Sequence, residues 1–170
     1  MRLVVLSDTH LAPGSKRRLP DAVYDAVDAA DAILHAGDIV TADLVHELSG
    51  FAPVHAVLGN NDDAVLAGML PETRVDDFAG VRIGMIHDSG AREGRPARMR
   101  RRFPDCDVVV YGHSHIPVCT SGADGQLLFN PGSPTDKRMQ PVATYGVLDV
   151  DGGRVVSAEI VPLPVSRPEG

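Results

Sequence analysis

The stretch Arg2-Leu3-Val4-Val5-Leu6-Ser7-Asp8 decides the fold class, because it is a continuous apolar run that ends in a polar pair. Such a run is typical of a strand that is buried on both faces of a parallel sheet. Residues 32–38 (AILHAGD) and 54–62 (VHAVLGNND) repeat this form, and helical patterns over about 19–30 and 41–48 separate the three runs. Strand, helix, strand, helix, strand at this spacing predicts βαβ units.

The second half of the chain predicts antiparallel pairing. Residues 81–87 (VRIGMIH) and 107–111 (DVVVY) have the pattern of strands, the first paired with 74–78, and an arginine-rich helix is expected over about 96–103. Turn signals at 123–125 (ADG) and 151–153 (DGG) each lie between two apolar runs, which indicates hairpins. We therefore expect a mixed, two-sheet α/β sandwich in a single domain.

Composition narrows the class of protein. A chain of 170 residues with 44% apolar residues suits one soluble domain. Cys106 and Cys119 match neither a zinc ribbon nor a disulfide framework, so we expect free thiols in the cytoplasm. No stretch resembles a signal peptide or approaches the ~20 apolar residues of a membrane span, so no membrane partner is expected. The net charge of −7 argues against a nucleic-acid partner.

Polar residues follow the predicted strands at their carboxyl ends, the edge where open α/β sheets bind ligands. Two aspartates, one asparagine and four histidines are expected to meet there: Asp8, His10, Asp38, Asn60, His87, His113 and His115. Oxygen and imidazole donors without a thiolate suit Mn²⁺, Fe, Zn²⁺ or Ni²⁺ rather than a structural zinc site.

The spacing of these residues has a mechanical explanation. In Asp8-x-His10 and His113-x-His115, the alternation of an extended chain would send both side chains to the same side. Glycine precedes Asp38, Asn60 and His113, where it permits a sharp turn or a close backbone approach. Asp38 is central in the set, so we expect its carboxylate to bridge two metal ions roughly 3.5–4 Å apart.

In this order the motifs resemble those of the calcineurin-like metallophosphoesterase superfamily. Residues 34–38 (LHAGD) and 129–138 (FNPGSPTDKR) extend the resemblance to its small bacterial phosphodiesterase branch, and the likeness runs from Leu3 to about Pro162. The resemblance implies a four-layer αββα sandwich of two mixed β-sheets, formed by residues 1–163 as one domain. Residues 164–170 are expected to be a frayed tail.

The resemblance also implies roles for the ligands. Asp8, His10 and His115 would hold the first metal ion, Asn60, His87 and His113 the second, and Asp38 both. Mn²⁺ is the leading choice of metal, with Fe, Zn²⁺ or Ni²⁺ as alternatives. A hydroxide between the two ions would attack the phosphorus atom, with Asp38, Asn60 and His113 acting directly in catalysis.

Departures from the family pattern concern the residues around the ligands. Asn61 stands where many members have a histidine that protonates the leaving group, and an amide cannot act as a general acid, so good leaving groups are favoured. The triplet Asp-Arg-Gly of Ser/Thr phosphatases does not follow Asp38. Asn61, Asp62 and Arg138 remain candidates for supporting a ligand or contacting the substrate.

Six arginines between residues 92 and 102 permit two interpretations. On a helix, Arg95, Arg98 and Arg102 would share one face, and that face is either solvated or an anion funnel on the substrate side. His35 lies within a predicted strand, so we expect it to be buried with its hydrogen bonds satisfied.

Together these features favour a metal-dependent phosphodiesterase that acts on a small phosphate ester. A phosphomonoesterase is a close alternative. A non-catalytic scaffold, like the retromer subunit that resembles this fold, is disfavoured by the complete ligand set, and a DNA nuclease is disfavoured by the acidic charge. The natural substrate stays open, as does the oligomeric state, a homo-oligomer included.

Overall fold

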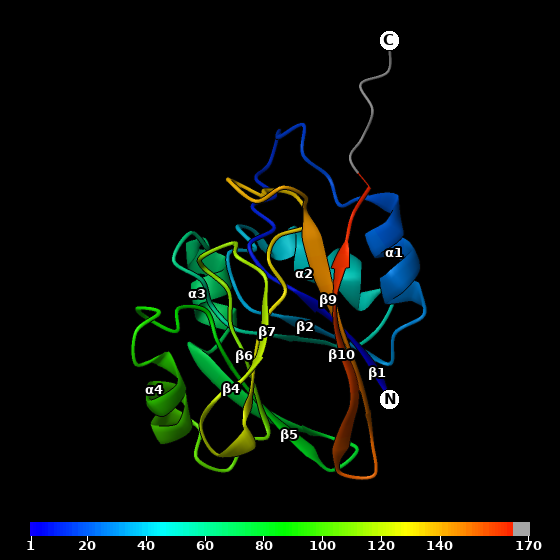
Figure 1. Cartoon of the computed structure of the whole chain (residues 1–170). Helices are drawn as coiled ribbons and strands as arrows, with labels where there is room; N and C mark the ends of the chain where they lie inside the picture. The colour runs from blue at the N-terminus through cyan, green and yellow to red at the C-terminus, as the bar shows by residue number, and fades with distance from the viewer. Residues whose placement is uncertain (165–170) are drawn as a thin grey trace.

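The computed structural model describes residues 1–164, so residues 165–170 of the expected tail lie outside the described residues. Two five-stranded mixed sheets form its centre (Figure 1). In spatial order the first sheet contains β10 (Arg154–Pro162), β9 (Thr144–Asp151), β1 (Arg2–Leu6), β2 (Ala32–His35) and β3 (Val54–Ala56). The second sheet contains β4 (Thr73–Phe78), β5 (Val81–Ile86), β6 (Val108–Val110), β8 (Leu127–Asn130) and β7 (Val118–Ser121). The helices of the described residues are α1 (Asp21–Asp28), α2 (Ala42–Ser49), α3 (Ala64–Met69), α4 (Arg95–Arg102) and the short 3-10 helix η1 (Ala123–Gly125).

The apolar run near the start of the sequence forms the central strand of the first sheet. β1 pairs with β2 in parallel and with β9 antiparallel, so that Val4 lies opposite Ile33 on one side and Val147 on the other. Neighbours on both edges and cores on both faces explain why this strand is almost continuously apolar.

Alternate side chains of β1 face different layers of the molecule. Leu3 and Val5 lie in the core between the two sheets, whereas Val4 and Leu6 lie in the core beneath the helices of the first sheet. On the opposite side, α4 packs on the second sheet through Met99 (Figure 1). The four-layer αββα sandwich of two mixed sheets is therefore confirmed.

The hairpins also form where the turn signals predicted them. β7 and β8 are joined through η1, and β9 and β10 are joined through residues 152–153. α3 was not predicted, because six residues are too few for a helical periodicity to stand out. The side chain of Asp63 caps this helix by accepting a hydrogen bond of 2.8 Å from the backbone N–H of Leu66.

The fold turns the carboxyl ends of β1, β2 and β3 toward the same edge as those of β5 and β6, and the loops that follow these five strands carry the polar motifs. Among the described helices, none has the length and hydropathy that a membrane crossing needs.

Candidate metal centre

The seven side chains predicted as ligands lie together at this shared edge, linked by short contacts between their donor atoms. Two groups of three residues bring ligand atoms within 4.8 Å of one another. One group is Asp8, His10 and His115, and the other is Asp8, Asp38 and His87. Asp8 belongs to both groups, a central position that its place in the sequence did not indicate.

Asp38 directs one carboxylate oxygen toward each half of the site. Its Oδ2 lies 3.4 Å from Nε2 of His10, and its Oδ1 lies 3.4 Å from Nε2 of His87. A carboxylate with one oxygen on each side has the placement that a bridge between two cations requires.

Asn60 lies in contact with two of the histidines, His87 and His113. Its Oδ1 lies 3.0 Å from Nε2 of His87 and 3.0 Å from Nδ1 of His113. On the other side, Nε2 of His10 lies 3.2 Å from Nε2 of His115, and the two rings are stacked with their centroids 5.1 Å apart. The donor atoms therefore form two groups, with Asn60, His87 and His113 on one side and His10 and His115 on the other.

This donor set fits divalent metal ions. Neutral imidazole nitrogens and carboxylate oxygens are electron-pair donors, and a cation resolves the repulsion between lone pairs that converge on one point. Burial raises the pKa of Asp8, which is 0% exposed, because an anion without a compensating charge is costly in a protein interior. A metal ion between these residues would offset that cost.

The ionisation of Asp38 is controlled by its neighbours. Burial by itself would raise the pKa of this carboxyl, but hydrogen bonds from His87 and Asn61 outweigh burial and hold the pKa well below its ordinary value. The Asp38 carboxylate is therefore an anion at neutral pH. Its presence raises the pKa of His87 against the opposing effect of burial.

The backbone at the ligands corrects one expectation from the sequence. Asp8, His10, His113 and His115 are not extended, because each has a left-handed backbone with φ between 46° and 66°, and Asp38 has φ of 56°. Non-glycine residues adopt this region rarely, and such residues cluster at functional sites. The paired side chains meet because the chain turns sharply at each ligand, not because of strand alternation.

The glycines before the ligands provide the close backbone approach that the sequence predicted. A Cβ atom on Gly112 would lie 1.8 Å from Oγ of Ser7, and one on Gly59 would lie 2.0 Å from the backbone nitrogen of Asp38. Gly37 has φ of +88°, and its Cβ would lie 2.8 Å from Nδ1 of His87. Side chains at these positions would push the ligand loops apart.

Backbone carbonyls orient two of the histidines from behind. Nδ1 of His87 lies 2.7 Å from the carbonyl oxygen of Ala36, and Nδ1 of His115 lies 2.5 Å from that of Asp136. If each Nδ1 carries the proton, each Nε2 presents its lone pair to the site, the usual arrangement of a metal-binding histidine. The hydroxyl of Ser7 donates a 2.7 Å hydrogen bond to Oδ2 of Asp8, a contact that the sequence motifs did not indicate although Ser7 directly precedes Asp8.

Asn61 and Asp62 support the site from the same loop as Asn60. Asn61 donates to both oxygens of Asp38, from its backbone N–H at 2.8 Å and from its Nδ2 at 2.7 Å. Asp62 accepts one hydrogen bond of 2.7 Å from the backbone N–H of Val40 and another from that of Gly59. It thereby joins the loop after β2 to the loop after β3, which carry Asp38 and Asn60.

The arginines of the segment from Arg92 to Arg102 contact different parts of the molecule. Arg98 donates to the carbonyl oxygens of Ser89 at 2.9 Å and of Ala91, which holds the loop after β5. Arg102 instead lines a cavity of about 330 Å³ together with Asn60, His87 and His113. Neither a solvated face nor an anion funnel describes Arg98, because its guanidinium is bonded to the loop.

Two other predicted residues lie further from the centre. Arg138 is exposed, has φ of 47° and does not line this cavity. His35 is buried as expected, and burial lowers its pKa to about 3. Its Nε2 lies 3.2 Å from Oγ1 of Thr9, but its Nδ1 is buried without a hydrogen-bond partner in the described residues, so the expectation of a fully satisfied imidazole is wrong.

An αββα sandwich with histidine, aspartate and asparagine donors at its strand ends has the architecture of a metal-dependent phosphoesterase. The chain belongs to the calcineurin-like phosphoesterase superfamily, whose domain profile matches residues 1–153.

Two relatives agree with this membership, and a more distant structure shares the fold. A probable metallophosphoesterase of Methanothermobacter thermautotrophicus is 36% identical over 95% of this chain and 92% of that protein. The solution structure of Thermotoga maritima protein TM1076 is 32% identical, with a TM-score of 0.74 over 95% of this chain and 99% of that one. Wild-type Vps29 of Entamoeba histolytica, solved with zinc, shares the fold at 23% identity, with a TM-score of 0.76 over 96% and 98% of the two chains.

Proposed function

We propose that this metal-dependent phosphoesterase is a dinuclear phosphodiesterase. The observation that carries the proposal is the position of Asp38, which points one oxygen toward His10 and the other toward His87, 3.4 Å away in each case. Asp8, His10 and His115 would hold one divalent ion, and Asn60, His87 and His113 the other, with Asp38 shared. Mn²⁺ is the proposed metal, because the donor set is oxygen and imidazole only.

Two divalent ions at such a site activate water and offset the negative charge that develops on the phosphoryl oxygens. The chain itself would bind and orient the ester. Within residues 1–164, Arg102 is the only arginine or lysine that lines the cavity beside Asn60, which Glu72 and Asp88 also line. Its guanidinium can pair with a phosphate oxygen. The cavity leaves space beside the ligands for a second ester substituent.

The preference for a diester is expected from the charge of the substrate and from the residues that line the cavity. A phosphodiester carries one negative charge and a monoester close to two at neutral pH, so a single arginine suits the diester better. Asn61 is engaged with Asp38 and carries no acidic proton, so no side chain at that position can protonate the leaving group. Substrates with acidic leaving groups should therefore react fastest.

The test compares hydrolysis of bis-p-nitrophenyl phosphate with that of p-nitrophenyl phosphate in the presence of Mn²⁺. The diester should have the higher kcat/KM, and Asp38→Asn and His113→Ala should each lower it by about 100-fold or more. Asp43→Asn and His46→Ala, exposed positions on α2, make the same chemical changes away from the site and should leave the rate unchanged. Absence of hydrolysis with Mn²⁺, Fe²⁺, Zn²⁺ and Ni²⁺ alike would overturn the proposal.

A second candidate is a protein-binding scaffold without catalytic activity. The similarity in fold to Vps29 is the reason to consider a scaffold, although a relative of 23% identity is informative about the fold alone. The gathered set of seven donors favours catalysis, because a scaffold has no need of it. Fewer than one tightly held ion per chain would favour the scaffold. Because Vps29 was itself solved with zinc, a metal-loaded protein is assigned by its hydrolysis of bis-p-nitrophenyl phosphate.

The proposed setting is the cytoplasm. Cys106 is buried and Cys119 is exposed, and both are free thiols, which suits a reducing compartment.

A further inference from the structure

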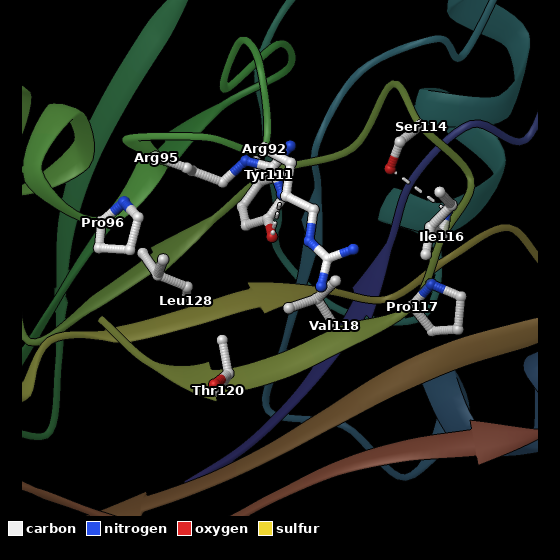
Figure 2. Close-up of a pocket in the computed structure, with 10 residues that line it drawn as sticks. All are labelled: Arg92, Arg95, Pro96, Tyr111, Ser114, Ile116, Pro117, Val118, Thr120 and Leu128. Atoms are coloured by element: carbon white, nitrogen blue, oxygen red, sulfur yellow. Dashed lines mark hydrogen bonds between the residues drawn. The ribbon is translucent and has the colours of Figure 1, made fainter.

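A second cavity, of about 530 Å³, lies on the outer face of the second sheet (Figure 2). Met99 of α4 and Phe103, which follows the helix, cover part of this face. The cavity lies at the other end of the helix, beside Arg95 and Pro96, over β7, β8 and the end of β6. Its size is within the roughly 300–1,000 Å³ that small-molecule sites occupy.

The floor of this cavity is apolar. It is formed by the ring of Tyr111 and the side chains of Leu128 and Val118, which belong to the outer core cluster of the sheet. Ile116 adds to the wall and is 48% exposed. An apolar surface of this kind favours a ligand with an aromatic or aliphatic body.

Two guanidinium groups lie over this floor, and none of the carboxylates in the described part of the chain lines the cavity. The chain of Arg92 extends across the cavity between Tyr111 and Val118 (Figure 2), and its guanidinium has no hydrogen bond or ion pair within residues 1–164. In a protein with a net charge of −7, two arginines without a facing acid form a local site for an anion.

Arg95 is held in place for such a contact. Its guanidinium carbon lies 5.0 Å from the centre of the Tyr111 ring, and its amino groups donate to the Tyr111 hydroxyl at 3.4 Å and to the carbonyl oxygen of Gly90 at 3.0 Å. Its Nε is buried and has no hydrogen-bond partner in the described part of the chain. Burial raises the pKa of Tyr111, so the hydroxyl keeps its proton and can donate as well.

From these contacts we propose that the cavity binds a small amphipathic anion. Its acidic group pairs with Arg92 and Arg95, and its apolar body lies on Tyr111, Val118 and Leu128. The site is distinct from the metal centre, because His113 and His115 face Asn60 and Asp8 whereas Ser114, between them, lines this cavity. A ligand here could be the distal part of a phosphate-ester substrate or a separate effector, and the two have the same chemistry.

The probe is 8-anilinonaphthalene-1-sulfonate, an aromatic body with one fixed negative charge, titrated by fluorescence and calorimetry into folded, metal-free protein. We expect saturable binding of one probe per chain. N-phenyl-1-naphthylamine, which has the same rings without the sulfonate, should bind more weakly. Because metal is absent, this binding does not depend on phosphoesterase activity.

Three variants test whether the probe binds in this cavity. Arg92→Gln should weaken sulfonate binding by about three- to tenfold, the loss of one partly exposed charge-assisted contact, and should leave the uncharged probe unaffected. Arg101→Gln makes the same change at an exposed position of α4 that does not line the cavity, and should leave both affinities unchanged. Thr120→Trp, an exposed wall position, should fill the cavity and abolish binding of both probes.

The proposal is overturned if the sulfonate fails to saturate at one per chain, if Arg92→Gln and Arg101→Gln weaken it equally, or if Thr120→Trp binds as the parent does. With metal-loaded protein, competition between the probe and bis-p-nitrophenyl phosphate identifies the ligand as part of the substrate. Binding without competition identifies a separate effector. Either result upholds the site.

Discussion

Replacement of Asp38 by asparagine tests whether the seven side chains hold metal ions. The substitution keeps the size of a side chain that is 1% exposed and removes its negative charge. Each of its oxygens lies 3.4 Å from the Nε2 of a histidine, so both halves of the site lose a charged donor at once. We expect the metal-dependent part of the stability to decrease sharply.

The magnitude follows from binding linkage. A ligand at 100 times its Kd raises the free energy of unfolding by about 2.7 kcal/mol. In a domain of this size each kcal/mol raises Tm by about 2–4 °C, so saturating Mn²⁺ should raise the Tm of the parent protein by about 5–11 °C. If Asp38→Asn weakens binding tenfold, the same metal concentration stabilises the protein by only about 1.4 kcal/mol, and the rise in Tm falls to about 3–6 °C.

The assay is thermal unfolding, followed by circular dichroism, in EDTA and in excess MnCl₂. Asp43→Asn, exposed on α2, is the matched control and should show the full rise. Metal binding through Asp38 is contradicted if the Tm of Asp38→Asn rises as much as that of the parent protein, or if Mn²⁺, Fe²⁺, Zn²⁺ and Ni²⁺ all leave the Tm of the parent unchanged. The EDTA curves show whether the variant folds, so loss of fold and loss of metal binding are distinguished.

Three further predictions concern the supports of the site. Gly112→Ala should lower the free energy of unfolding in urea by about 1–3 kcal/mol, because its Cβ would lie 1.8 Å from the hydroxyl oxygen of Ser7. A Cβ atom on Gly68 would have no heavy atom within 4 Å, so Gly68→Ala should not lower the free energy of unfolding. Equal losses in the two variants would show that the contact with Ser7 is not the cause. Asp62→Asn should weaken Mn²⁺ binding about tenfold in calorimetry, because Oδ1 accepts from Val40 and Oδ2 from Gly59, and an asparagine amide keeps only one of these two acceptors; an unchanged Kd would show that Asp62 does not position the ligands. His35 has a folded-state pKa of about 3 against 6.5 unfolded, so its contribution to stability is complete above pH 6.5 and is lost as pH falls from 6.5 toward 3, by about 1.4 kcal/mol per unit. His35→Gln should flatten this slope in metal-free protein between pH 6.5 and 4.5, and parallel curves would exclude the histidine as its source.

Local patterns in the sequence were sufficient for the framework of the fold. Buried parallel strands need apolar side chains on both faces, so β1 and β2 stand out as unbroken apolar runs that end in polar residues. The order of strands and helices then restricted the sheet connections, and the common edge of the strand ends indicated which side chains would meet. The set from Asp8 to His115 could be predicted for this reason.

The arrangement around that set depended on contacts between distant segments. Asp62 joins two loops through backbone N–H groups that have no sequence signature, and carbonyl oxygens hold His87 and His115 from behind. The left-handed backbone at the ligands also departs from local preference, since tertiary contacts must stabilise it.

The arginine segment illustrates the division between sequence and tertiary structure most directly. Its composition determined that positive charge would follow β5, because every guanidinium is ionised at neutral pH. Only packing decided that Arg98 would hold a loop, that Arg102 would line a cavity with Asn60 and His113, and that Arg92 would cross an apolar cavity. The side chains are chemically identical, so their roles depend on which groups the folded chain places within reach.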